Sequence, residues 1–212
     1  MTARAPAAGE NLRHVALDQT HIAWLPGKEN SRHQGQLVSD YVAETGLPTP
    51  EALCNLLIEE NLGVLLVMHQ GDDDLIGPFL AHDRYMMGSD GIYHEDGAIH
   101  PRQYGSAARL LGPAVRDKGW LTLEDAVYKL SGFLARRFGL TQRGELREGW
   151  YADVVVFDPD TITDRATYRD PHQLAVGVEH VLVNGAAIIA GGQPVTELPS
   201  PLPGRALKFK QP

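Results

Sequence analysis

The chain has 212 residues, of which 43% are hydrophobic and 22% charged, and this composition excludes a wholly disordered protein. Its formal net charge of −8, with no basic block, argues against nucleic-acid binding, because phosphate neutralisation requires clustered Lys and Arg. The longest apolar runs, 64–68 and 186–190, fall far short of the about 20 residues that a membrane span needs. The N-terminus has no apolar core of a signal peptide, so we expect a cytoplasmic protein that binds no membrane.

The single cysteine, Cys54, excludes an internal disulfide and a cysteine-rich zinc module. Its neighbours Leu53 and Leu56 are apolar. Free cysteine most often behaves as a small hydrophobic residue, so this context predicts a buried, unreactive thiol.

The first half of the chain alternates helix and strand signals. Residues 1–23 are predicted to be loose, and residues 36–44 to form a short helix that ends before Gly46. A second helix starts at Thr49, with Thr49 as N-cap, and ends at Gly63. The apolar run 64–68 that follows predicts a strand buried on both faces, as in a parallel sheet.

The same alternation continues to residue 139. We expect a helix over 72–80, a second strand over 84–88, and helices over 104–118 and 122–138. Thr122 and Asp125 have the spacing of a capping box at the start of the last helix. This order of elements is typical of an α/β protein with a parallel sheet.

The pattern changes to β near Gly144. A strand is predicted over 153–158, and two more over 178–183 and 186–190, which flank the strong hairpin signal Asn184-Gly185. A further strand is expected over 206–210. We therefore place a domain boundary between residues 143 and 144.

The candidate chemistry lies at the predicted strand ends. Asp90 follows the second predicted strand, where barrel enzymes place catalytic groups, although this segment alone favours a plain Asp-Gly turn. His69, His94 and His100 are either metal or anion ligands, or solvated loop residues. Two interpretations are open for the acidic run Asp72, Asp73 and Asp74. It could bind a metal ion, but we favour a helix cap followed by an acidic first turn.

An ordered set of motifs resembles the N-acyl-D-amino-acid deacylase (D-aminoacylase) branch of the amidohydrolase superfamily. It begins with Gly88-Ser-Asp-Gly91 and His100-Pro-Arg102. The similarity continues through residues 104–105, 109–112, 123–126, 135–140, 152–159 and 180–185, and covers roughly residues 24–208. The most specific part is Ser-Asp-Gly about a dozen residues before His-Pro-Arg.

The resemblance implies a fold class and roles for four residues. The fold is α/β: residues 24–143 are the C-terminal fragment of a (β/α)8 barrel with strands seven (64–68) and eight (84–88), and residues 144–212 are part of a small β-sandwich. Asp90 is then general base and zinc ligand, and Arg102 binds the substrate carboxylate, with Ser89 and Gly91 beside the substrate. The reaction is hydrolysis of the linear amide bond of an N-acyl-D-amino acid.

The resemblance also shows what the sequence lacks. No residues match several metal ligands of the family: its His-x-His pair, its middle-strand ligand and its two later histidines. We therefore expect an incomplete zinc site and a chain that is inactive by itself. Unpaired strand edges then predict a complementing N-terminal barrel half or self-association. The alternatives are an inactive remnant or interaction module, and a cyclic amidase of the dihydroorotase or hydantoinase type, over which His-Pro-Arg favours the acylase branch.

Overall fold

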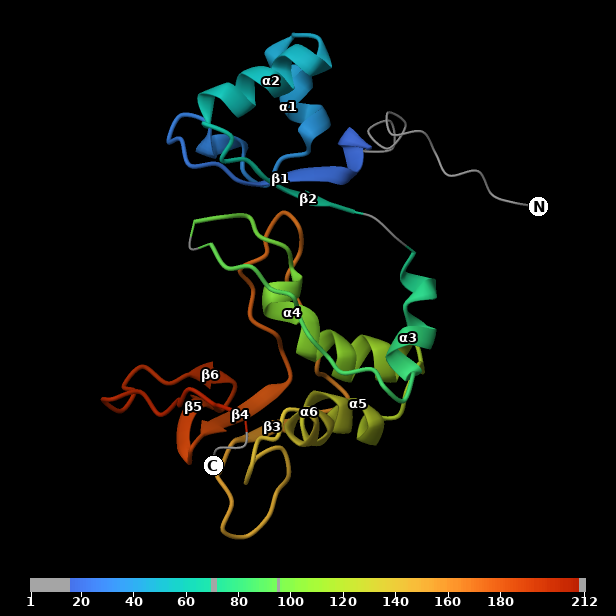
Figure 1. Cartoon of the computed structure of the whole chain (residues 1–212), viewed down its shortest axis with the longest axis vertical. Helices are drawn as coiled ribbons and strands as arrows, with labels where there is room; N and C mark the ends of the chain where they lie inside the picture. Colours follow the sequence, from blue (N-terminus) through green and yellow to red (C-terminus); the bar gives the residue numbers. More distant parts are fainter. Residues whose placement is uncertain (1–15, 70–71, 95, 210–212) are drawn as a thin grey trace, which may run out of the picture. The chain divides into compact units, whose positions relative to one another are not determined.

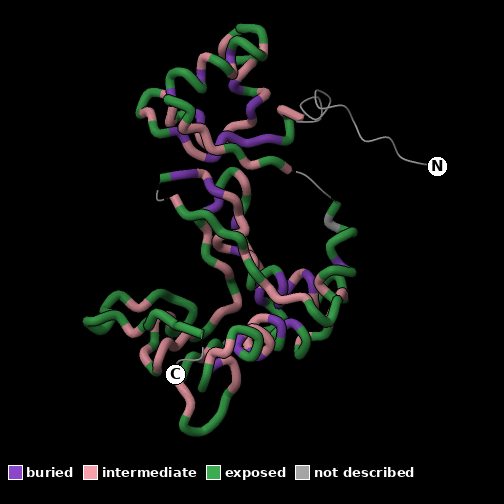
Figure 2. The backbone as a smooth tube through the Cα atoms, viewed as in Figure 1, coloured by how far each residue is buried: buried purple, intermediate pink, exposed green. Residues whose placement is uncertain are grey.

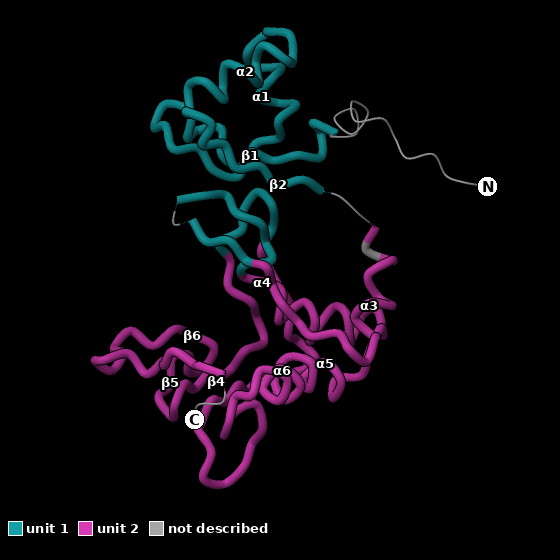
Figure 3. The backbone as a smooth tube through the Cα atoms, in the orientation of Figure 1, with its two compact units in different colours: residues 1–71, 91–103, 167–172 teal, residues 72–90, 104–166, 173–212 magenta. Residues whose placement is uncertain are grey.

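The computed structural model describes residues 16–69, 72–94 and 96–209 (Figure 1). The chain divides into two compact units (Figure 3). Unit 1 comprises residues 1–71, 91–103 and 167–172, and unit 2 comprises residues 72–90, 104–166 and 173–212. The Ser-Asp-Gly segment therefore crosses from unit 2 into unit 1 at Gly91.

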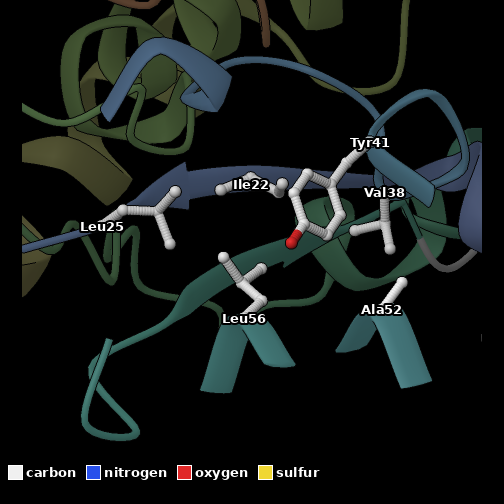
Figure 4. Packing of buried hydrophobic residues seen from close by; sticks show 6 residues of the cluster. All are labelled: Ile22, Leu25, Val38, Tyr41, Ala52 and Leu56. Atoms are coloured by element: carbon white, nitrogen blue, oxygen red, sulfur yellow. The ribbon is translucent and has the colours of Figure 1, made fainter. Parts of the chain in front are cut away.

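Unit 1 packs two helices against a two-stranded antiparallel sheet. Strand β1 (Thr20–Trp24) pairs with β2 (Leu65–Met68), and the helices are α1 (Val38–Thr45) and α2 (Thr49–Glu59). Short 3₁₀ turns precede β1 and α1, namely η2 (Leu17–Gln19) and η3 (Ser31–His33). The core combines apolar side chains one helical turn apart on α1 and α2 with residues in and directly after β1, as Figure 4 shows: Ile22, Leu25, Val38, Tyr41, Ala52 and Leu56.

Unit 2 is mainly helical up to residue 137. Its helices are η4 (Asp73–Leu75), α3 (Gly77–Ala81), the π-helical η5 (Leu110–Asp117), α5 (Leu123–Leu130) and α6 (Gly132–Arg137). Helix α4 (Arg102–Arg109) begins in unit 1 and continues in unit 2. The core of unit 2 consists of small and branched apolar side chains: Ala108, Leu110, Leu111, Ala114, Ala126 and Ile162.

The β-part of unit 2 confirms the predicted antiparallel sheet. Its strands are β3 (Val154–Phe157), β4 (Val178–Val183), β5 (Ala186–Ala190) and β6 (Gln193–Pro194), hydrogen-bonded in that order. Asn184 and Gly185 make the tight turn between β4 and β5 with φ of 48° and 83°, a left-handed conformation that Asn and Gly tolerate best. None of these four strands contains a fully buried residue (Figure 2).

The predicted parallel pair of strands is wrong. Strand β2 forms where expected, but its partner is β1, to which it runs antiparallel. The segment 84–88 is not a strand: residues 83–84 form a turn and residues 85–90 have no regular structure. The apolar run in β2 suggested two buried faces, yet Leu66 and Met68 are 41% and 46% exposed, so one face of this strand is open.

Other local predictions need smaller corrections. Pro48, not Thr49, is the N-cap of α2, and the cap makes no side-chain hydrogen bond. Cys54 is exposed rather than buried, because Ala52 and Leu56 carry the buried face of α2. Residues 17–23 are not loose, since they form η2 and most of β1, while residues 1–15 lie outside the described residues.

The long helices predicted after residue 104 are each interrupted. Pro113 has no N–H to donate and lies inside η5, where the helix is of the π type. Ser131 separates α5 from α6, and its hydroxyl donates to the Val127 carbonyl at 2.7 Å, which competes with the helical ladder. The predicted Thr122 cap is confirmed, because Thr122 Oγ1 accepts from the Asp125 N–H at 3.1 Å. The strand expected over 206–210 is absent from residues 206–209, and Lys210 lies outside the described residues.

The domain boundary placed at residue 144 falls within unit 2 and stays a prediction. It coincides with the change from helices to sheet. In the part of the chain that the structure describes, no helix is both long enough and apolar enough to cross a membrane.

Close packing of η5 against residue 162 makes Gly112 a sensitive position. A Cβ atom at Gly112 would overlap the Ile162 carbonyl oxygen, and backbone cannot move aside as a flexible side chain can. We expect Gly112→Ala to lower the free energy of unfolding by about 2–3 kcal/mol, as overpacking of a core does. Urea unfolding followed by circular dichroism measures this, with Gly204→Ala as control because a Cβ there meets open space. Equal stability of the two variants would contradict the packing described.

Candidate functional site

The Ser-Asp-Gly segment adopts an unusual backbone conformation. Asp90 has φ of 48°, a left-handed conformation that is uncommon outside glycine and that Asp tolerates better than most residues. Ser89 is half-buried, whereas Asp90 and Gly91 are exposed. Backbone conformations of this kind cluster at functional sites, and Asp90 is exposed here.

Arg102 begins helix α4 directly after a turn that His100 closes. The Arg102 backbone N–H donates to His100 Nδ1 at 3.0 Å, so this ring nitrogen is an acceptor. In a neutral imidazole the other nitrogen, Nε2, then carries the proton, and it lies 3.3 Å from the Tyr168 hydroxyl oxygen. His100 therefore links the start of α4 to the segment around Tyr168, and Arg102 itself is half-buried.

Tyr168 is the centre of a ring cluster within unit 1, formed by Tyr168, His21, His69 and His100. The His69 and Tyr168 ring centroids are 3.7 Å apart, and His21 stacks on Tyr168 with centroids 5.7 Å apart. His69 Nε2 and His21 Nδ1 share a hydrogen bond of 2.9 Å, which needs only one proton. Burial lowers the pKa of His21, and the neighbouring His69 and Arg169 lower it further, against the opposing effect of Asp40. Ring contacts and hydrogen bonds thus join β1 and β2 to the segment around Tyr168.

Sequence reasoning missed two members of this cluster, His21 and Tyr168. Neither belongs to a recognisable motif, and only the pairing of β1 with β2 brings His21 beside His69. His94 is not part of it, because its ring stacks on Trp24 with centroids 4.7 Å apart.

The aspartates at the start of unit 2 have structural partners. Asp72 Oδ1 accepts from the Asp74 backbone N–H at 2.9 Å, and the Asp74 carboxylate lies 3.4 Å from Lys118 Nζ. These contacts support the predicted helix-start role for Asp72 rather than a metal cluster.

The described residues do not fit a catalytic zinc site. Residues 16–69, 72–94 and 96–209 contain no group of three or more His, Cys, Asp or Glu side chains that could hold a metal ion. Catalytic zinc requires three protein ligands, and Asp90 offers one carboxylate.

Comparison with known proteins decides the family. The pattern of the Amidohydrolase family matches residues 81–189, just over half of the chain. The chain belongs to this family. The expected resemblance is thereby confirmed, and the matched region includes Ser89, Asp90, Gly91 and Arg102.

Several relatives of this amidohydrolase chain are deacylases. It is 35% identical over 195 residues to the N-acyl-D-aspartate deacylase of Alcaligenes xylosoxydans xylosoxydans, covering 91% of this chain and 38% of that protein. It is 45% identical over 176 residues to the D-aminoacylase of the same organism, covering 83% of this chain and 35% of that protein. The N-acyl-D-glutamate deacylase of Bordetella bronchiseptica, solved with zinc and a phosphonate inhibitor, is 35% identical with a TM-score of 0.74.

That likeness covers 87% of this chain and 38% of the Bordetella enzyme. The chain thus spans less than two fifths of the length of these relatives. The likeness supports the predicted α/β amidohydrolase fold for the part of the relatives that this chain covers.

Proposed function

We propose that this chain supplies the proton-accepting carboxylate and the substrate-binding arginine of an N-acyl-D-amino-acid deacylase. The observation that carries the proposal is identity of 35% and 45% to two such deacylases over most of the chain, which retains the ordered Ser-Asp-Gly and His-Pro-Arg motifs. The reaction breaks a linear amide C–N bond with water and releases a carboxylic acid and a D-amino acid.

Asp90 takes the role of general base. Its exposed carboxylate accepts a proton from the attacking water and then delivers that proton to the nitrogen of the leaving amine. Asp90 is also the proposed contribution of this chain to zinc binding. Because the described residues provide no further ligand group, the remaining zinc ligands come from outside them in this proposal.

Arg102 takes the role of substrate clamp. A guanidinium holds a carboxylate through two parallel hydrogen bonds, which suits the free carboxylate of an N-acyl-amino acid. The hydrogen bonds of His100 to the Arg102 backbone and to Tyr168 support the position of this residue. Ser89 and Gly91 are proposed to contact substrate beside Asp90.

We infer that residues 24–143 correspond to the C-terminal part of the amidohydrolase barrel, although residues 84–88 form no strand here, and that β3 to β6 are part of a β-sandwich. A complementing barrel half, or a second copy of the chain, would then cover the apolar surface left open. Exposed apolar side chains on β2 and α3 support this inference, with Met68 46% and Phe79 71% exposed.

The second candidate function is a non-catalytic interaction module. The observation in its favour is that the described residues contain no group able to hold a metal ion. A cyclic amidase is the weaker alternative function, since the relatives compared are deacylases.

Replacing Arg102 tests the proposed function. In an assembly that hydrolyses N-acetyl-D-glutamate, we expect Arg102→Ala to raise KM by about tenfold or more with a smaller change in kcat, because a lost clamp weakens substrate and transition state alike. Arg102→Lys should recover part of the loss, since it restores the charge without the bidentate geometry. Steady-state kinetics with the D enantiomer measure the KM of both variants, and the same assay with the L enantiomer measures stereoselectivity. Unchanged KM in Arg102→Ala, or equal turnover of both enantiomers, would contradict the proposal.

A further inference from the structure

Lys129 is a buried lysine that the proposed hydrolysis does not use. It lies in the last turn of α5 and is only 5% exposed, although lysine is almost never fully buried unless it is paired. Its ammonium group donates to the His82 backbone carbonyl at 2.6 Å and lies 5.8 Å from the centre of the Tyr85 ring. Burying a charge against these groups is costly, so filling of the core by itself does not account for a lysine at this position.

The Lys129 side chain holds the turn that follows α3. The His82 carbonyl accepts from Lys129 Nζ and also from the Tyr85 backbone N–H at 2.9 Å, so both of its lone pairs are used. A cation within about 6 Å of the centre of an aromatic ring is attracted to the face of that ring. Burial raises the pKa of Tyr85, so this ring is a neutral phenol at neutral pH. The ammonium group therefore contacts the turn at two residues.

The Lys129 backbone contacts the same segment further along. Carbonyls in the last turn of a helix have no partner within the helix, and the Lys129 carbonyl accepts from the Met87 N–H at 3.5 Å. The Met87 side chain packs against the core of unit 2, as does Leu130, the neighbour of Lys129 in α5. A single residue of α5 thus contacts the segment at residues 82, 85 and 87.

Asp90 comes directly after this segment. Residues 85–90 have no regular structure, so no helix or sheet defines the path of their backbone. Gly88 and Ser89 are the two residues between Met87 and Asp90. An anchor at Met87 therefore limits where the Asp90 carboxylate can lie.

We propose that Lys129 is a positioning residue, which holds Asp90 in place through residues 82–87. The inference rests on the proposed role of Asp90 as general base. Lys129 acts on the backbone that carries Asp90 and does not itself contact substrate. Its contacts lie in unit 2, whereas Arg102 lies in unit 1, so Lys129 affects the placement of the base and not the binding of the substrate carboxylate.

Lys129→Met tests the proposal in an assembly that hydrolyses N-acetyl-D-glutamate. Methionine fills much of the space of lysine but has neither its charge nor its N–H donors. We expect kcat to fall about 10- to 100-fold, because a shift of about 1 Å in a catalytic group can lower the rate about a hundredfold. KM should change by less than about threefold, since the substrate clamp is untouched. Lys129→Arg should recover part of kcat, because it restores the charge and a donor.

Lys118→Met is the matched control for this substitution. Lys118 is also a lysine of unit 2, but its side chain is 51% exposed and pairs with Asp74 at the surface. We expect Lys118→Met to leave kcat and KM unchanged.

Hydrogen–deuterium exchange on the chain alone measures the anchor without substrate. Lys129→Met should speed exchange of the Tyr85 and Met87 amides by about fivefold or more, because their segment loses its hold on α5. Amides of β4 and β5 should exchange as before. A residue that only stabilises the fold would instead speed exchange throughout unit 2 and lower the urea midpoint.

Unchanged kcat of Lys129→Met in an active assembly would overturn the proposal and leave the deacylase function standing. Unchanged exchange at Tyr85 and Met87, or equally faster exchange over the whole of unit 2, would overturn it as well. An unmodified assembly that hydrolyses no N-acyl-D-amino acid would instead contradict the proposed function, and the exchange experiment would then decide by itself whether Lys129 anchors the segment.

Discussion

Asp90→Asn is expected to lower kcat of an active assembly by about 10²–10⁴-fold, the usual contribution of a positioned general base. The amide has nearly the size of the carboxylate but accepts no proton at neutral pH. Because Asp90 is exposed and lies in a segment without regular structure, the substitution should leave the fold and the KM for N-acetyl-D-glutamate largely unchanged. Steady-state kinetics with purified variants measure the effect.

Asp96→Asn is the matched control for this substitution. Asp96 is an exposed carboxylate in the same loop, and its backbone carbonyl accepts a hydrogen bond from Gln34 Nε2 at 3.0 Å. We expect full activity from Asp96→Asn. Equal activity of Asp90→Asn and the unmodified chain would remove Asp90 from the mechanism.

Asp153→Ala is expected to destabilise unit 2 by about 3–5 kcal/mol, the usual cost of leaving a buried charge without its partner. Arg143 is 8% exposed, and its Nη1 donates to Asp153. Its Nη2 donates to Asn184 Oδ1 at 2.8 Å, and Asp153 Oδ1 accepts from the Asn184 N–H at 2.8 Å. The network joins the link after α6 to the turn between β4 and β5, so its loss should loosen the sheet from the helices.

Urea unfolding monitored by circular dichroism measures this loss, with Asp74→Ala as the comparison. Asp74 also forms an ion pair, with Lys118, but both side chains are more than half exposed. Such surface pairs contribute about 0–1 kcal/mol. A loss below about 1 kcal/mol in Asp153→Ala would show that the network is not a determinant of stability.

The elements that the sequence predicts well are those with local signals. The hairpin at Asn184-Gly185 and the Thr122 cap depend on residues at most a few positions apart, and both form as expected. Helix α1 ends where Gly46 adopts φ of 65°, again a property of one residue.

The predictions that failed depend on distant partners. A run of apolar residues indicates a strand but not the direction of its neighbour, so the antiparallel pairing of β2 with β1 was not accessible. The side that a short helix buries is set by what packs on it, which is why Cys54 is exposed.

For the candidate site, sequence motifs singled out Asp90 and Arg102, whose roles stay predictions, and the structure adds the hydrogen bonds around Arg102. The support of Arg102 through His100 depends on Tyr168, 68 positions away from His100, and no local pattern marks that residue.

The most direct test of the account combines zinc analysis with an activity assay, on the chain alone and on the chain mixed with the complementing N-terminal part of a related deacylase. The account predicts that the chain alone holds no tightly bound zinc and does not hydrolyse N-acetyl-D-glutamate, because Asp90 is one ligand where about three are needed. The mixture should bind zinc and hydrolyse the D enantiomer, with both properties weakened by Asp90→Asn. A chain that alone carries about one zinc ion and is active would contradict the account.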